Sequence, residues 1–168
     1  VDSESRKAFH ELLDLLRELD TRFLGPEWLI GSPADVGEAL RAVMHLLQGG
    51  LVSYFEEDPD HPVFRRIVSP TRKFTGDNAD TVYYDAPVSP ARTYRIRGNT
   101  AGAVYVSLTV EAGAQDGRFG TRTAGAINDT QFDVAADGTF AILAGGPPRP
   151  RNWIALPADA SRITTRHY

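Results

Sequence analysis

The feature that most constrains this chain is a change of hydrophobic period near Pro62. Before this point, apolar residues recur at the three- and four-residue spacing of amphipathic helices. After it, apolar and polar residues alternate in short runs separated by Gly and Pro, as in antiparallel strands. The change predicts an α+β protein, mainly β, in which two amphipathic helices precede an antiparallel β-sandwich. We expect a helical region over residues 1–61, packed on a β domain over residues 62–168.

Both expected helices have an apolar stripe and recognisable end signals. The first stripe consists of Phe9, Leu12, Leu13, Leu15, Leu16, Leu19 and Phe23, and Gly25-Pro26 ends it. For the second helix, Ser32 is the expected N-cap, Pro33 the first helical residue and Asp35 the capping-box partner. Gly49-Gly50 closes this helix, and one short helical turn is expected over residues 51–55.

The remainder of the chain reads as short strands. They are expected over residues 63–68, 81–88, 93–97, 103–111, 131–135, 139–143, 154–156 and 162–168. Asp137-Gly138 is a two-residue hairpin signal between two of them. In the run with the clearest alternation, the core side is Val104, Val106, Leu108 and Val110. The opposite side, with Tyr105, Ser107 and Thr109, is a candidate ligand surface.

One stretch carries a family resemblance. The run Gly76-Asp-Asn-Ala-Asp-Thr-Val-Tyr83 resembles the Gly-Asp-Asn-Pro-Asp-x-x-Tyr signature of the domain-of-unknown-function 1214 family, with Ala79 in place of proline. Further blocks follow in the family's order, at residues 86–90, 94–98, 105–110, 137–140, 152–156 and 163–168. The resemblance implies a jelly-roll-like β-sandwich and no established activity. Members of this family usually continue beyond the point where this chain stops.

Composition excludes several chemistries. The 168 residues include no cysteine, so disulfides, thiolate metal sites and cysteine nucleophiles are excluded. The formal charge of −4 argues against nucleic-acid binding. No apolar run or signal-peptide pattern indicates a membrane partner, which favours a cytoplasmic location unless a leader preceded Val1. No motif indicates a cofactor.

A cluster of oxygen-bearing side chains precedes the strand at 81–88. Asp77, Asn78 and Asp80 could hold a cation, but the spacing of a calcium-binding EF-hand loop is absent and no metal is expected. The simpler interpretation is that Asp77 and Asn78 hydrogen-bond their own turn. Asp80 and Asp85 should point to opposite faces, which argues against a carboxylate pair for hydrolysis.

Other weak ligand-binding candidates lie elsewhere in the chain. They are Tyr83, Arg95, Arg97 and Trp153. Trp153 could stack on a sugar, although a lone tryptophan more often anchors a core or loop. The glycine-rich stretch over residues 112–129, with Arg118 and Arg122, is expected to be a long loop. No Gly-x-Ser-x-Gly motif positions a nucleophile, so no catalytic residue is assigned.

Three classes of function remain open. The favoured one is a binding or interaction module, for an unknown small molecule or glycan or for a protein. The second is a hydrolase with a cleft on a sheet face, lined from among Asp77, Asp80, Arg95, Arg97 and His167. The third is a structural subunit of an assembly.

The end of the chain suggests a partner. The sequence stops at Tyr168 inside an expected strand, which we take as an edge strand with unpaired backbone groups. We therefore expect a longer protein or pairing with a second chain, including self-association. Ile163 and Thr165 should share a face with His167, which is expected to be packed or hydrogen-bonded rather than catalytic.

Overall fold

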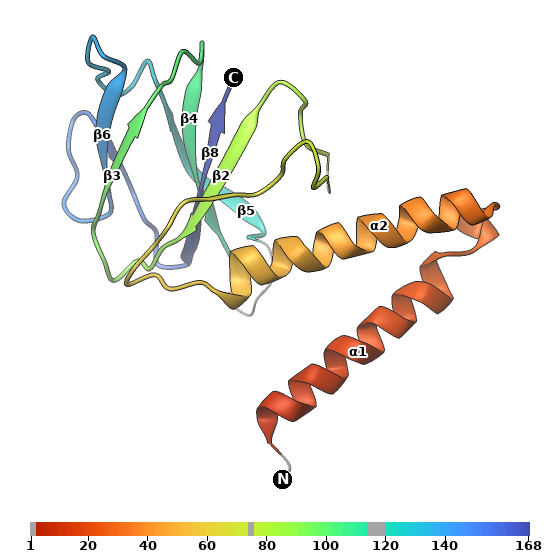
Figure 1. Ribbon diagram of the computed structural model, residues 1–168. Coiled ribbons are helices and arrows are strands. Elements are labelled where there is room, and N and C mark those ends of the chain that lie inside the picture. The colour runs from red at the N-terminus through yellow and green to blue at the C-terminus, as the bar shows by residue number, and fades with distance from the viewer. Residues whose placement is uncertain (1–2, 74–75, 114–119) are drawn as a thin grey trace. The chain divides into compact units, whose positions relative to one another are not determined.

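A computed structural model describes residues 3–73, 76–113 and 120–168 of the chain. Helices α1 (Glu4–Phe23) and α2 (Pro33–Gly50) come first, separated by the 3₁₀ turn η1 (Pro26–Trp28). A π-helical turn, η2 (Leu51–Phe55), and two mostly antiparallel sheets follow (Figure 1). The α+β class with two leading helices is thus confirmed. The chain divides into two compact units, residues 1–48 and residues 49–168.

The helix ends follow the local signals in the sequence. Ser3 caps α1, because its hydroxyl accepts a hydrogen bond from the Arg6 amide at 3.2 Å. Ser32 and Asp35 form the expected capping box, with the Asp35 amide 3.2 Å from Ser32 Oγ and the Ser32 amide 3.0 Å from Asp35 Oδ2. The unit boundary lies at residues 48/49 rather than 61/62, because η2 contacts the β-rich unit.

The larger sheet has five strands in the order β1-β2-β8-β4-β5, all antiparallel. They are β1 (Arg65–Arg66), β2 (Val82–Pro87), β4 (Val106–Ala112), β5 (Arg122–Asn128) and β8 (Ala160–His167). The smaller sheet has the order β3-β6-β7, with β3 (Tyr94–Asn99) antiparallel to β6 (Thr139–Ala144). The last strand, β7 (Trp153–Ile154), is parallel to β6.

The two sheets share one apolar core, to which strands of both contribute. Val106, Leu108 and Val110 are exposed by no more than 1%, as their alternation predicts. Val104 was expected in the same row but is 87% exposed, because it lies outside β4, which begins at Val106. Ser107 and Thr109, on the opposite side of β4, are also buried, with 5% and 4% exposure.

Two expected strands and one expected loop differ in the structure. The run over residues 63–68 contains only the two-residue β1, and residues 131–135 contribute a single bridge, from Val134 to Phe140. The expected long loop contains β5, whose Gly- and Ala-rich sequence has weak strand propensity. Arg122 begins this strand, while Arg118 lies outside the described residues.

The last strand is not an edge strand, contrary to the expectation from its position in the sequence. β8 pairs with β2 on one side and with β4 on the other, so its backbone groups are occupied along both edges. Its faces alternate as predicted, because Ile163 and Thr165 pair with core residues of β4. His167 packs edge-on against Tyr84 at 5.8 Å between ring centres, and its Nε2 lies 3.1 Å from Thr165 Oγ1.

Candidate functional site on the outer face of the five-stranded sheet

The five-stranded sheet has a polar side that points away from the shared core, here called the outer face. Across the strands, Thr164 is paired with Asp85 and with Thr109. Two residues further along β8, Arg166 is paired with Tyr83 and with Ser107. Ile163, the residue before Thr164, belongs to the core, and Thr165, between Thr164 and Arg166, pairs with the core residue Leu108. Thr164 and Arg166 therefore point to the other side of β8, so these side chains share the outer face. The face therefore combines residues from β2, β4 and β8 that are far apart in the sequence.

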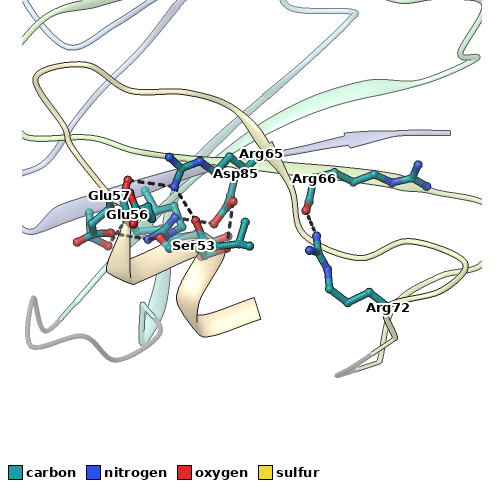
Figure 2. A network of polar contacts seen from close by, with 11 residues as sticks. Ser53, Glu56, Glu57, Arg65, Arg66, Arg72 and Asp85 are labelled. Carbon is teal, nitrogen blue, oxygen red and sulfur yellow. Dashed lines mark hydrogen bonds and ion pairs between the residues drawn. The ribbon is translucent and has the colours of Figure 1, made fainter. Parts of the chain in front are cut away.

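One end of the outer face, the closed end, is covered by η2 and the residues that follow it. Arg162, only 7% exposed, donates from Nη1 to Asp85 Oδ2 at 2.6 Å. Its Nη2 donates to the Ser53 carbonyl at 2.6 Å and to Glu57 Oε2 at 2.7 Å. Figure 2 shows Ser53, Glu57 and Asp85 gathered at this place.

Two further contacts complete the closed end. The guanidinium of Arg162 lies over the ring of Tyr54, with 4.4 Å from Cζ to the ring centre. Arg65 donates from Nη1 to the carbonyls of Val52 and Glu56, at 2.6 and 3.0 Å. Burial raises the pKa of the Asp85 carboxyl, and Arg162 opposes that shift by stabilising the charged form. The charges are paired and the side chains satisfied, which is the arrangement of a structural ion pair.

The other end of the outer face, the open end, contains a pocket of about 530 Å³. The residues that line this outer pocket include Tyr105, Ser107, Thr109, Gln131, Arg166 and Tyr168. Arg166 is half-buried and donates from Nη1 to Thr109 Oγ1 at 3.1 Å. Among the described residues, no carboxylate lies within the 4.0 Å of an ion pair with it.

The electrostatics of the open end are dominated by Arg166. Its Cζ lies 6.0 Å from the centre of the Tyr83 ring. Glu111 lies further along the same face, and burial raises the pKa of its carboxyl while the charge of Arg166 lowers it. At the opposite margin, the rings of Tyr105 and Tyr168 meet edge-on, 5.8 Å apart. The pocket thus has a cation inside and two aromatic rings at its rim.

The turn before β2, which contains the candidates Asp77, Asn78 and Asp80, is held in part by its own hydrogen bonds. Asn78 Oδ1 accepts a hydrogen bond from the Asp80 amide at 2.9 Å, and Tyr83 Oη accepts one from the Asn78 amide at 3.1 Å. Asp77 differs from expectation, because its carboxylate pairs with Lys73 at 2.6 Å rather than with the turn backbone. Asp85 pairs with Arg162 and not with Asp80.

The remaining candidates lie on a different surface. Arg95 and Arg97 alternate with the core residue Ile96, so they occupy the side of the three-stranded sheet that faces away from the core. They line a second pocket, of about 470 Å³. Trp153 is paired with Leu143, which is also the partner of Arg95, and its indole donates to the Gly145 carbonyl at 2.9 Å. Of the seven candidates, Tyr83 is the one that reaches Arg166.

The sequence interpretation missed Arg166 as a site residue although the signals were present. Alternation placed Ser107 and Thr109 on one face of their strand and Arg166 on one face of another. The sequence did not indicate that β4 pairs with β8, and this pairing brings those faces together. The closed end had no comparable signal, because nothing local to Asp85 or Arg162 indicates that η2 covers them.

Two other kinds of site are absent from the described residues. No group of three or more His, Asp or Glu side chains there is arranged to hold a metal ion. Within the same residues, no helix has the length and apolar content needed to cross a membrane.

Comparison with known proteins gives a likeness of fold. No protein-family model matches the chain, and no curated protein matches it. The crystal structure of an uncharacterised protein from Burkholderia cenocepacia matches with a TM-score of 0.80 and 25% identity, over 96% of this chain and 45% of that protein. The chain therefore spans less than half the length of that protein. A Vibrio parahaemolyticus protein, VPA0106, is similar at a TM-score of 0.38 and 16% identity, over 98% of this chain and 38% of that one.

Proposed function

We propose that residues 49–168 form a small-molecule-binding module whose ligand occupies the outer pocket. The observation that carries this proposal is the half-buried Arg166 in that pocket, with no carboxylate of the described residues at ion-pair distance. An arginine that the surrounding protein leaves unneutralised is available to bind a group from outside.

Two further properties support the proposal. The pocket volume of about 530 Å³ falls in the range of roughly 300–1,000 Å³ that is usual for small-ligand sites. Three of its polar groups, on Ser107, Thr109 and Arg166, stand on β4 and β8, which are central strands paired on both sides. Groups on such rigid elements hold their positions better than groups on loops, which lowers the cost of ordering them on binding.

The alternatives have less support. The residues of the hydrolase hypothesis lie at three places: Asp77 and Asp80 before β2, Arg95 and Arg97 on the other sheet, and His167 on the core side of β8. The hypothesis of self-association drew on an open edge at β8, and that edge is occupied. Self-association by other surfaces stays a prediction, which light scattering on the purified chain would check.

A ligand screen observed by NMR tests the binding proposal. A library of small acids, bases and neutral sugars would be added to the ¹⁵N-labelled full chain. Binding should move the backbone amide signals of Ser107, Thr109 and Arg166, and Arg166→Gln should weaken it. Arg95→Gln, on the other sheet, is the matched control and should leave binding unchanged. If no compound in the library moves these signals, the proposal is overturned.

We also propose that the two sheets form a jelly-roll-like sandwich and that the chain belongs to the domain-of-unknown-function 1214 family. The order of the sequence blocks supports this, from the turn at Gly76–Tyr83 to the hairpin signal at Asp137-Gly138. Superposition of an experimental structure of this chain on an experimental structure of a member of that family would test it. The two turns should then coincide with turns of the same length and sequence pattern.

A further inference from the structure

We propose that the ligand of the outer pocket is a small organic acid with one carboxylate and a ring. The carboxylate pairs with the guanidinium of Arg166, and the ring lies against Tyr105 and Tyr168. This inference rests on the proposed function, since it names the class of molecule that the binding module takes.

First, Arg166 has hydrogen-bond donors that the described residues leave unused. A guanidinium carries five N–H donors in a planar fork that matches the two oxygens of a carboxylate. Arg166 uses this fork for one side-chain bond within the described residues, to Thr109 Oγ1. Since that bond comes from Nη1, the Nη2 and Nε groups are left for an incoming acceptor.

The second step concerns charge. Apart from Arg166, the side chains that line the pocket are neutral, with hydroxyl, amide, aromatic and aliphatic groups. Glu111 is a nearby acid on the same face, but it is not within ion-pair distance, and burial disfavours its charged form. A ligand that brings one negative charge would therefore pair with Arg166 without competing with a side-chain carboxylate in the lining.

The third step separates a carboxylate from a phosphate. Proteins usually bind phosphate groups with several cations, or with the backbone amides of a helix N-terminus or a glycine-rich loop. Among its described lining residues, the outer pocket has one cation, on a strand, and no helix. One arginine supplies one positive charge, which balances a carboxylate but not both charges of a phosphate dianion.

The fourth step concerns the body of the ligand. Tyr105 and Tyr168 remain 37% and 40% exposed at the rim of the pocket, although tyrosine rings gain from covering their apolar faces. Their rings meet edge-on, so each keeps a face available for a flat group. A ring joined to a carboxylate would cover that aromatic surface while its charge reaches Arg166.

The test uses matched probes on the ¹⁵N-labelled full chain. The first probe is 4-hydroxybenzoate, the second is 4-hydroxybenzamide, which keeps the ring and lacks the charge, and the third is phenyl phosphate. Titrations would follow the backbone amides of the pocket and the side-chain Nε signal of Arg166. We expect 4-hydroxybenzoate to bind about 10- to 100-fold more tightly than the amide, the difference expected of a charged hydrogen-bonded pair. Arg166→Gln should remove that difference, whereas Arg97→Gln, on the other sheet, should leave it intact.

The possible outcomes separate this inference from the proposed function. If the benzamide binds as tightly as the benzoate, or if Arg166→Gln leaves the preference unchanged, the carboxylate inference is wrong but the pocket still binds ligands. A preference for phenyl phosphate over the benzoate would also overturn the inference in favour of a phosphate ligand. If no probe moves the pocket signals, the inference is wrong. The proposed function is then decided by the broader ligand screen.

Discussion

Arg162 and Arg166 lie on the same strand and the same face, yet their surroundings are opposite. Arg162 is buried at the closed end, where it pairs with two carboxylates and a carbonyl. Arg166 is half-buried at the open end, where its side-chain partners among the described residues are a threonine hydroxyl and a tyrosine ring. The difference arises from one segment, since η2 and Glu57 cover the first arginine and not the second.

The comparison shows that position under a covering segment, rather than residue type, separates a structural charge from an available one. Removing a partner from a buried ion pair leaves the other charge stranded in a poorly solvated place. A partly solvated cation has no such dependence, so it can bind or release an anion without destabilising the fold. Substitutions along β8 and the segments that contact it test this contrast.

The largest effect is expected for Arg162→Met. It leaves Asp85 buried without its partner, so the free energy of unfolding should fall by about 3–5 kcal/mol. The matched variant Arg166→Met should cost about 1 kcal/mol or less, because it loses one hydrogen bond at a partly solvated site. Urea denaturation in a Trp28→Phe background, in which Trp153 fluorescence reports on the β-rich unit, measures both. Equal losses for the two variants would refute the contrast.

Leu108→Ala measures how much an ordinary core residue of the same sheet contributes to the free energy of unfolding. Leu108 is 1% exposed, so its truncation should cost about 2–5 kcal/mol. Val104 is 87% exposed in the same alternating run, and Val104→Ala should change the free energy of unfolding by less than about 0.5 kcal/mol. The same denaturation assay compares them, and a large loss for Val104→Ala would mean that this valine is covered.

A smaller effect is expected for Glu57→Gln. The side chain of Glu57 is 41% exposed, so solvent screens its ion pair with Arg162. Its removal should cost about 0–1 kcal/mol, since Asp85 still pairs with the arginine. If denaturation instead gives a loss close to that of Arg162→Met, Glu57 and not Asp85 is the partner on which the closed end depends.

The smallest effect concerns His167, on the core side of the same strand. Burial lowers the pKa of His167, so the unfolded chain binds a proton more readily than the folded chain. Its contribution to stability is complete above the unfolded pKa of about 6.5 and is lost as the pH falls through the folded pKa. Denaturation of wild type and His167→Gln between about pH 5 and 8 should show a shallower acid loss for the variant. Identical slopes would contradict this.

Local features of the fold could be predicted, whereas features set by distant segments could not. The capping box of α2 and the buried side of β4 depend on residues close together in sequence, and both were found where the pattern placed them. The edge assignment of β8 failed because a strand's neighbours are not encoded in its own alternation. β5 was missed because its composition resembles a loop.

The candidate site illustrates the same limit. Arg166 contacts Thr109 across 57 residues, and Arg162 contacts Asp85 across 77 residues and Ser53 across 109. Alternation assigned Thr109, Asp85 and Arg166 each to a face of its own strand, but no signal in a single sequence says which faces meet. Residues chosen for their chemistry alone, such as Arg95 and Asp80, accordingly lie on different surfaces.

Because β8 is the central strand of the five-stranded sheet and follows its other strands in the chain, the sheet cannot be completed until β8 has been synthesised. In the five-stranded sheet, β2 and β4 each hydrogen-bond to β8 and not to each other. During synthesis both emerge before β8, so the sheet consists of two separate ribbons with open edges until that strand is released. Its insertion closes contacts of long sequence separation, which are slow to form. A nascent chain halted before Ala160 therefore exposes two unpaired strand edges, the state in which it is most prone to aggregate.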